Sequence, residues 1–258
     1  MSENTSENTS GTTSATTSAT TRATSAGAAG FNPGRVLVTG GGSGLGAAIV
    51  QGVIAAGGTP VVLDRDISRV TGVKAFEVDV SDREAVEKAV REAAETMDGL
   101  DAVVTAAGID RCGALDTVPA DQWEKVIGVN LMGTASTARA ALPYLKETHG
   151  RVVTIASTLG IKAVGDATAY CASKFGVMGF SQALAAETAG QIGVTTIIPG
   201  GMKTRFFDDR DEQYKPQDDS RLNDPERVAE AILFALSQSK SCEIREMVIA
   251  HAEEGSWP

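Results

Sequence analysis

Few of the 258 residues are of the types that build disulfide-rich folds or metal sites. There are three cysteines and two histidines. Cys112, Cys171 and Cys242 are widely separated, and none belongs to a C-x-x-C pair or to a cysteine–histidine cluster. This spacing indicates neither a disulfide framework nor a structural zinc site. We therefore expect no bound metal, and isolated cysteines fit the reducing cytoplasm, which is the localisation that we predict.

Positive charge is also scarce, and long apolar runs are missing. Lys and Arg total 23 against 33 for Asp and Glu, which gives a formal net charge of −10. Nucleic acids and anionic membranes select a basic surface, so we expect neither as a partner. No run approaches the ~18 apolar residues of a membrane-spanning helix. The G-x-S-x-G of a hydrolase nucleophile elbow is only partly matched, and a hydrolase is disfavoured.

The first 30 residues contain little that could form a core. SENT occurs twice, TTSA occurs twice, and the segment continues in the same Ser/Thr/Ala-rich manner. Such a composition cannot bury enough apolar surface to fold. It also lacks the apolar stretch of a secretory signal. We predict a disordered tail at residues 1–30 and a single catalytic domain at residues 31–258.

The most informative stretch that is present is VLVTGGGSGLGAAIV, residues 36–50. A short apolar run predicts a strand, five glycines follow among residues 40–46, and apolar residues then recur at helical spacing. Glycines permit positive φ angles and close approach of a ligand to the backbone. The amino end of a helix attracts anions. The stretch therefore predicts a loop that binds the pyrophosphate of a dinucleotide.

Predicted strands and helices alternate along the rest of the chain. The strands are continuous apolar runs, which is typical of a parallel sheet covered on both faces. A capping box, Ser81 with Glu84, marks one helix start, and Asp224 with Pro225 marks the last one. The fold class is therefore α/β: a doubly wound parallel sheet, or Rossmann fold, in three αβα layers with about seven strands. We place the strands at 36–39, 59–64, 73–78, 100–108, 151–157, 195–200 and 246–250, and longer helices at 121–147 and 167–189.

Asp64 indicates which dinucleotide binds. It ends a predicted strand 24 residues after Gly40, close to the ~20 expected for the acid that binds an adenosine ribose. A carboxylate there accepts hydrogen bonds from a ribose diol and repels a 2′-phosphate. Arg65 could meet such a phosphate, but Asp66 stands next to it. We therefore favour NAD over NADP.

Tyr170 and Lys174 are four residues apart on a predicted helix, so they share one face. An ammonium held near a phenol favours the phenolate and lowers the pKa of the tyrosine toward a useful range. The alternative is a core tyrosine beside a snorkelling lysine, since Y-x-x-x-K is common by chance. The dinucleotide loop upstream, and Ser157 at a preceding strand end, favour the catalytic interpretation.

Asn130 is a polar residue on an otherwise apolar helical stripe with Trp123, Val126 and Leu131. A buried amide without partners costs on the order of 1–3 kcal/mol. Two interpretations stay open from this feature alone. Asn130 either bonds to neighbouring backbone or is a polar group that faces a site.

Together these motifs resemble the short-chain dehydrogenase/reductase family over about residues 34–250. The single-domain type carries T-G-x-x-x-G-x-G, found here from Thr39 to Gly46, and an Asn-Ser-Tyr-Lys set, found here as Asn130, Ser157, Tyr170 and Lys174. The resemblance implies cofactor contacts at Thr39, Gly40, Gly42, Ser43, Gly44, Leu45, Gly46, Asp64, Arg65, Asp79, Val80, Ala106, Ala107, Gly108, Tyr170, Lys174, Pro199, Gly200 and Thr204.

The resemblance also implies an activity. Tyr170 would exchange a proton with the substrate oxygen while hydride moves between the carbinol carbon and the nicotinamide. Ser157 would hold that oxygen, Lys174 would bind the nicotinamide ribose, and Asn130 would keep a water in a proton relay. Members of the family are often tetramers, so we expect a homo-tetramer or homo-dimer packed through the helices at 121–147 and 167–189.

Two departures from the family pattern stand out. The family's Asn-Ala-Gly turn is Ala106-Ala107-Gly108 here, for which we expect slightly lower stability with activity retained. The C-terminal REMVIAHAEEGSWP looks more like the ends of hydroxy-acid or serine dehydrogenases. A small alcohol or ketone is the expected substrate, and its identity stays open. Residues 201–223 should cover the pocket, with apolar contacts from Phe206, Phe207 and Tyr214 and anion contacts from Arg205 and Arg210.

Two other functions have weaker support in the sequence. A sugar-nucleotide epimerase of the larger related branch would have T-G-x-x-G-x-x-G and a substrate domain, and both are missing. A dinucleotide-sensing regulator without catalysis is the remaining alternative. The intact set of Asn130, Ser157, Tyr170 and Lys174 disfavours it, because a sensor has no need of a matched acid–base group.

Overall fold

One seven-stranded parallel sheet forms the centre of the molecule in a computed structural model that describes residues 31–255. The tail expected at residues 1–30 lies outside the described residues. The strand order is β3-β2-β1-β4-β5-β6-β7, which confirms the predicted doubly wound sheet. The strands are β1 (Arg35–Thr39), β2 (Thr59–Asp64), β3 (Lys74–Glu77), β4 (Ala102–Thr105), β5 (Arg151–Ile155), β6 (Gly193–Pro199) and β7 (Glu246–Ile249).

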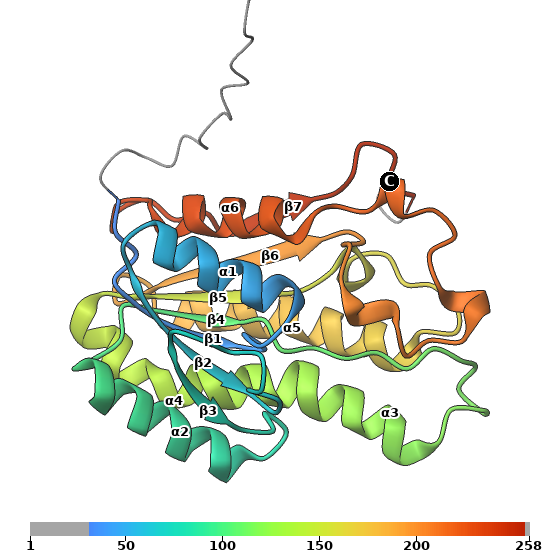
Figure 1. Cartoon of the computed structure of the whole chain (residues 1–258), viewed down its shortest axis with the longest axis horizontal. Coiled ribbons are helices and arrows are strands. Elements are labelled where there is room, and N and C mark those ends of the chain that lie inside the picture. The colour runs from blue at the N-terminus through green and yellow to red at the C-terminus, as the bar shows by residue number, and fades with distance from the viewer. Residues whose placement is uncertain (1–30, 256–258) are drawn as a thin grey trace, which may run out of the picture.

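Helices cover both faces of the sheet and make the three-layer architecture (Figure 1). On one face α1 and α6 pack against each other, and on the other α2 packs against α4. Each layer closes its own apolar core against the buried strands. The helices are α1 (Gly44–Ala55), α2 (Arg83–Met97), α3 (Ala120–Ile127), α4 (Gly133–Thr148), α5 (Thr168–Glu187) and α6 (Pro225–Leu236).

The strand order reverses at β1, which pairs with β2 on one side and with β4 on the other. The chain after β1 enters α1 on one face, whereas the chain after β4 continues to α3 and α4 on the other. The two connections separate at the carboxyl ends of these strands. In open α/β sheets this divergence creates the crevice in which ligands bind.

The segment expected as one helix over residues 121–147 is helical throughout, but it is not one regular α-helix. A π-helical turn at Gly128–Met132 separates α3 from α4. A π turn carries an extra residue, so it shifts the helical stripe by one position. Val129 and Asn130 are therefore buried in this turn, whereas Met132 is 54% exposed. Single π turns are frequent at functional sites, and this one positions Asn130.

The predicted capping box at the start of α2 is also wrong. Asp82 is the N-cap, and its carboxylate accepts the N–H groups of Glu84 and Ala85, each at 3.0 Å. Ser81 instead donates its backbone N–H and its hydroxyl to Asp79, at 2.9 and 2.6 Å. A carboxylate one residue later accepts two bonds from the helix, so it displaces the serine from the cap.

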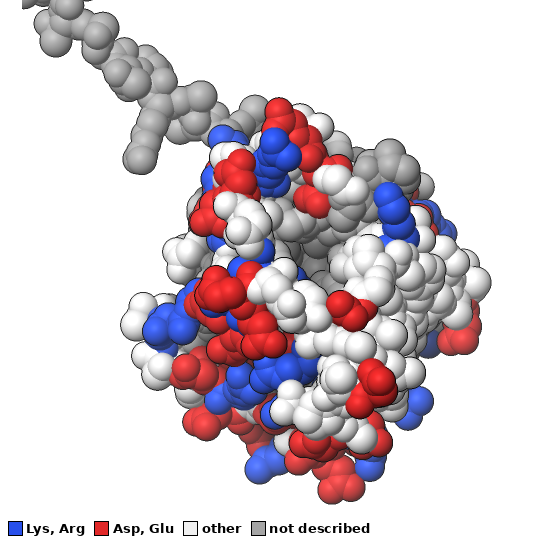
Figure 2. Space-filling view, turned by 90° about the vertical axis from the view of Figure 1, so that its right-hand side faces the viewer, with Lys and Arg blue, Asp and Glu red and all other residues white. Residues whose placement is uncertain are grey.

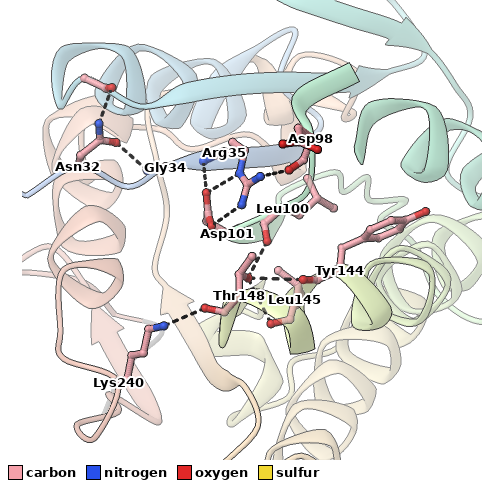
Figure 3. A network of polar contacts seen from close by, with 11 residues as sticks. Asn32, Gly34, Arg35, Asp98, Leu100, Asp101, Tyr144, Leu145, Thr148 and Lys240 are labelled. Carbon is pink, nitrogen blue, oxygen red and sulfur yellow. Dashed lines mark hydrogen bonds and ion pairs between the residues drawn. The ribbon is translucent and has the colours of Figure 1, made fainter. Parts of the chain in front are cut away.

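A polar network ties the strands together at the amino edge of the sheet, opposite the crevice (Figure 3). The Arg35 guanidinium donates to both carboxylate oxygens of Asp101, at 2.8 and 3.0 Å, and also to the carbonyl of Asp98. Arg35 holds the pKa of Asp101 below its usual value through this hydrogen-bonded pair. Thr148 and Lys240 extend the network to α4 and to the segment after α6. These bonds fix β1 beside β4.

No helix between residues 31 and 255 is long and apolar enough to cross a membrane. Within the same range, no group of three or more His, Cys, Asp or Glu side chains could hold a metal ion.

Candidate active site

The glycine loop packs so closely against neighbouring atoms that a Cβ would not fit at Gly40, Gly42 or Gly46. Gly40 has φ +70°, and a Cβ there would lie 2.7 Å from the Cα of Ala107. A Cβ on Gly46 would overlap the Gly40 carbonyl oxygen. A Cβ on Gly42 would lie 2.9 Å from a carboxylate oxygen of Asp64. The loop is therefore pressed against the ends of β2 and β4 at the predicted crevice.

The amino end of α1 has the chemistry that an anion needs. Ser43 is the N-cap in an extended conformation, and its side chain makes no capping hydrogen bond. The first turn also contains no acidic residue. Uncapped N–H groups and the positive end of the helix dipole favour a phosphate at this point. The side chain of Thr204 closes the loop from the other side, 3.4 Å from where a Cβ on Gly44 would stand.

Asp64 lies at the carboxyl end of β2, as predicted, directly beside the loop. Its carboxylate accepts the N–H of Gly42 at 2.8 Å and that of Asp66 at 3.0 Å. Each oxygen retains a lone pair for a further donor, so the group can still bind a ribose diol. Arg65 is exposed next to it.

Asp79 and Val80, two of the predicted cofactor contacts, follow β3. Hydrogen bonds from Ser81 hold the pKa of Asp79 below its usual value. Val80 is buried and packs against Gly133. Asp79 therefore faces the surface, and Val80 forms the floor beneath it.

Ser157, Tyr170 and Lys174 come together at the carboxyl end of β5. Tyr170 and Lys174 share the buried face of α5, and the Lys174 ammonium lies 5.5 Å from the centre of the Tyr170 ring. Ser157 begins a short 3₁₀ turn, where its hydroxyl accepts the N–H of Leu159 at 3.1 Å and is hydrogen bonded to Tyr170. Lys174 Nζ donates to the carbonyl of Ile155 at 2.8 Å. The sequence-predicted triad is thus one cluster.

The pKa of Tyr170 does not follow the sequence-based expectation. Burial raises the pKa of its phenol, and the hydrogen bond from Ser157 opposes this rise only in part. Burial also lowers the pKa of Lys174 to about 8. The pKa of Tyr170 is therefore raised and not lowered as expected, because the water that the buried phenol loses is the largest cause.

Burying Lys174 should cost stability, so we expect Lys174→Met to raise the free energy of unfolding by about 1–2 kcal/mol at pH 7. The native state releases the lysine proton near pH 8, whereas the unfolded chain holds it to about 10.5. Between these values the unfolded state binds more protons, so the wild type gains stability as pH rises and the advantage of the variant shrinks. Urea unfolding at pH 7 and pH 10 measures this difference.

Lys146→Met on the exposed face of α4 is the control and should change the free energy of unfolding by less than about 0.5 kcal/mol. A destabilised Lys174→Met contradicts the expectation.

Asn130 is 1% exposed and fully hydrogen bonded within the protein. Its amide accepts the N–H of Ile109 and donates to the Ile109 carbonyl, each at 2.9 Å, and it also donates to the hydroxyl of Ser173 at 3.0 Å. These bonds match the interpretation of a backbone link. The proton-relay role stays a prediction. Ser173 lies between Tyr170 and Lys174 in sequence and donates to the Tyr170 carbonyl at 2.7 Å, and no sequence pattern singled it out.

The turn Ala106-Ala107-Gly108 has its own connection to β1. The hydroxyl of Thr39 accepts the N–H of Ala107 at 3.2 Å. Gly108 lies beside Asn130 and Lys174, since a Cβ there would stand 3.6 Å from Asn130 Oδ1 and 3.7 Å from Lys174 Nζ. Thr39 therefore links the two strand ends.

Residues 201–223, which were expected to cover the pocket, lie against the Ser157–Tyr170–Lys174 cluster through Phe206. They form three short 3₁₀ turns at Arg205–Phe207, Glu212–Tyr214 and Asp219–Arg221. The Phe206 ring lies 5.7 Å from the ring of Tyr170, and the Tyr214 hydroxyl donates to Asp166 at 3.1 Å. Beside this segment is a polar hollow of about 720 Å³, lined in part by Asp110, Cys112, Arg210 and Tyr214. Figure 2 looks onto this side of the molecule, where acidic and basic side chains are interspersed around a hollow.

The turn after β6 is held by a residue that the sequence did not indicate. The Gly200 N–H donates to the carbonyl of Ile249, and the Gly201 N–H donates to the carboxylate of Glu254, both at 2.9 Å. Pro199 is the last residue of β6 and Gly200 follows it, so both lie at the strand end where they were predicted. Glu254 could be found only from the tertiary structure, because it lies 53 residues away from Gly201.

The chain is similar to known oxidoreductases over most of its length. Residues 34–215 match the profile of the short chain dehydrogenase family. An uncharacterized oxidoreductase of Staphylococcus aureus strain N315 is 34% identical over 224 residues, 83% of this chain and 95% of that protein. The meso-2,3-butanediol dehydrogenase of Serratia marcescens is 29% identical over 221 residues, 80% of this chain and 88% of that protein.

Solved structures show the same fold. A short chain dehydrogenase from Burkholderia cenocepacia J2315 in complex with NADP superposes with a TM-score of 0.77 at 27% identity, covering 85% of this chain and 97% of that one. An alcohol dehydrogenase from the archaeon Thermococcus sibiricus complexed with 5-hydroxy-NADP gives a TM-score of 0.78 at 23% identity, covering 86% and 97%.

Proposed function

Since the chain belongs to the short-chain dehydrogenase/reductase family and is an oxidoreductase, we propose that it transfers hydride between NAD(H) and a small secondary alcohol or its ketone. The observation that carries this proposal is the buried Ser157–Tyr170–Lys174 cluster beside the glycine loop. The relationship to a butanediol dehydrogenase supports a small hydroxylated substrate.

Each residue of the cluster has a defined task. Tyr170 takes the hydroxyl proton of the alcohol as the carbinol carbon becomes a carbonyl, and returns it in the reverse direction. The bound nicotinamide supplies the acceptor or donor of the hydride. Ser157 donates to the substrate oxygen and holds it toward Tyr170. Lys174, 2.8 Å from the Ile155 carbonyl, binds the nicotinamide ribose with its remaining protons.

The proposal of NAD over NADP rests on Asp64. A carboxylate anchored by Gly42 and Asp66 cannot turn away from a 2′-phosphate without losing two hydrogen bonds. The positively charged Arg65 is its exposed neighbour. A neutral residue at position 64 would leave that guanidinium free to pair with the phosphate.

Asp64→Ser should therefore lower the ratio of kcat/KM for NAD to kcat/KM for NADP by about tenfold or more, which corresponds to ~1.4 kcal/mol. Asp66→Ser is the matched control, since it removes the neighbouring carboxylate that bonds Ser68, and it should leave the ratio within about threefold. A wild type that prefers NADP by tenfold contradicts the assignment.

A screen of secondary alcohols, polyols and hydroxy acids with NAD and NADP, followed by reduced-nicotinamide absorbance, tests the activity itself. The expected result is turnover of at least one secondary alcohol. A protein that binds NAD tightly and turns over none of these compounds would support the remaining alternative, a dinucleotide-sensing regulator.

A further inference from the structure

A buried ion pair joins residues 201–223, called the covering segment below, to the loop after β4. The carboxylate of Asp110 accepts the guanidinium of Arg210 at 2.6 Å, across 100 residues of sequence. The two side chains are only 2% and 16% exposed. Asp110 also accepts the N–H of Arg111 at 2.7 Å and the thiol of Cys112 at 3.3 Å. These three contacts hold the Asp110 carboxylate in one geometry.

This pair lies next to the catalytic cluster. The Arg210 guanidinium carbon is 5.4 Å from the centre of the Phe206 ring, and that ring is 5.7 Å from the ring of Tyr170. The charges of both Asp110 and Arg210 act on the Tyr170 phenol, and in opposite directions. The ion pair therefore holds Phe206 against Tyr170, and its negative and positive charges largely cancel at the pocket.

The covering segment leaves no free cation for an anionic substrate. All five of its basic side chains have acidic partners within 4.0 Å, and four of these pairs are on the surface. They are Lys203 with Asp224, Arg205 with Asp208, Arg210 with Asp110, Lys215 with Glu212 and Arg221 with Asp218.

Lys174 is the other cation near Tyr170, and it donates to the Ile155 carbonyl. Under the proposed function its remaining donors serve the nicotinamide ribose. A substrate carboxylate beside Tyr170 would lose its water, meet the Asp110 carboxylate, and find the Arg210 guanidinium already paired.

We propose that Asp110 and Arg210 determine substrate specificity: their pairing makes the pocket select neutral alcohols and ketones and reject carboxylates. This inference rests on the proposed function and narrows its substrate class. It disagrees with the hydroxy-acid substrate that the C-terminal sequence suggests. In our proposal the covering segment, and not the C-terminus, supplies the charge that the substrate meets.

The test compares butane-1,3-diol with 3-hydroxybutanoate, which differ only in a hydroxymethyl group replaced by a carboxylate. The wild type should have the higher kcat/KM for the diol. Asp110→Asn keeps the size of the side chain but frees the Arg210 guanidinium, two of whose nitrogens now bond to Asp110 and to the Tyr214 carbonyl. In that variant the ratio of kcat/KM for the diol to kcat/KM for the hydroxy acid should fall by at least tenfold.

Two variants control the result. Asp166→Asn removes an equal charge that also contacts the covering segment, through Tyr214, and should leave the ratio unchanged. Asp110→Asn/Arg210→Gln removes the freed cation and should restore the preference for the diol. A wild type that uses both substrates equally, or a shift smaller than tenfold in Asp110→Asn, overturns the proposal.

A second measurement needs no turnover and separates this inference from the proposed activity. Trypsin should cut after Arg205 or Arg210 faster in Asp110→Asn than in the wild type or in Asp166→Asn, because the segment has lost its buried anchor. A wild type inactive on every alcohol contradicts the proposed function, whereas equal cleavage rates contradict the role of the pair. If Asp110→Asn misfolds, Asp110→Ser takes its place. Misfolding of both variants overturns the proposal, since the pair would then serve the fold alone.

Discussion

Tyr170→Phe is expected to lower kcat for alcohol oxidation by a factor of about 10²–10⁴ while the protein stays folded and still binds the cofactor. The substitution removes one oxygen from a side chain that is 9% exposed and packed against Phe206. The ring contacts remain, but the hydrogen bond to Ser157 and the proton acceptor are lost. The alcohol proton then has no acceptor in contact with it as the carbonyl forms, so the barrier rises by several kcal/mol.

Steady-state rates and cofactor binding by nicotinamide fluorescence measure this effect. Tyr144→Phe on α4, near the opposite edge of the sheet (Figure 3), is the matched control and should retain full activity. Because burial raises the pKa of Tyr170, oxidation by the wild type should increase with pH as the phenolate forms. The residual rate of the variant should lack that dependence. Equal turnover by wild type and Tyr170→Phe would show that the proton goes elsewhere.

Gly46→Ala should reduce the free energy of unfolding by about 2–3 kcal/mol and abolish tight dinucleotide binding. Gly46 is in the first turn of α1, and its added Cβ would overlap the Gly40 carbonyl oxygen and lie 3.0 Å from the Cα of Gly41. These are backbone atoms, so no side chain can rotate away. Either α1 moves off the sheet or the loop opens, and both displace the N–H groups that a pyrophosphate would bind.

Gly179→Ala on α5 gives the matched control for Gly46→Ala. It is also a helical glycine, but a Cβ there meets no atom within 4 Å. Its expected effect has the opposite sign, a gain of up to about 1 kcal/mol, because alanine is the better helix former. Urea unfolding and a fluorescence titration with NADH compare the two variants. A Gly46→Ala protein with wild-type stability and affinity would mean that the loop has room which the structure does not show.

Much of the site could be predicted because its chemistry lies at strand ends. The loop from Gly40 to Gly46, Asp64 and Ser157 each follow a short apolar run, and parallel strands bring their carboxyl ends to one edge. Tyr170 and Lys174 are four residues apart, so a regular helix is enough to align them. These relations depend on local geometry and on one rule of topology.

The failures of prediction have a common cause. The π turn at Asn130, the Asp82 cap and the pKa of Tyr170 all depend on what packs against the residue. Hydrophobic periodicity assumes a regular helix, and it cannot reveal one extra residue in a turn. Ser81 of the capping box and Asp82 compete for the same N–H groups at the start of α2, and hydrogen-bond geometry decides between them. The pKa depends on how much water the fold removes, which no spacing between Tyr170 and Lys174 encodes.

The sequence by itself therefore determined the sheet, the glycine loop and the grouping of Ser157 with Tyr170 and Lys174, because each depends on residues that are close along the chain or on a repeated strand-to-loop pattern. Only the tertiary structure decided how the pocket is closed. Asp110 meets Arg210 across 100 residues and Glu254 meets Gly201 across 53. Neither carboxylate belongs to a local pattern, since its partner arrives only when the sheet has assembled. The substrate preference that we infer rests on such a pair.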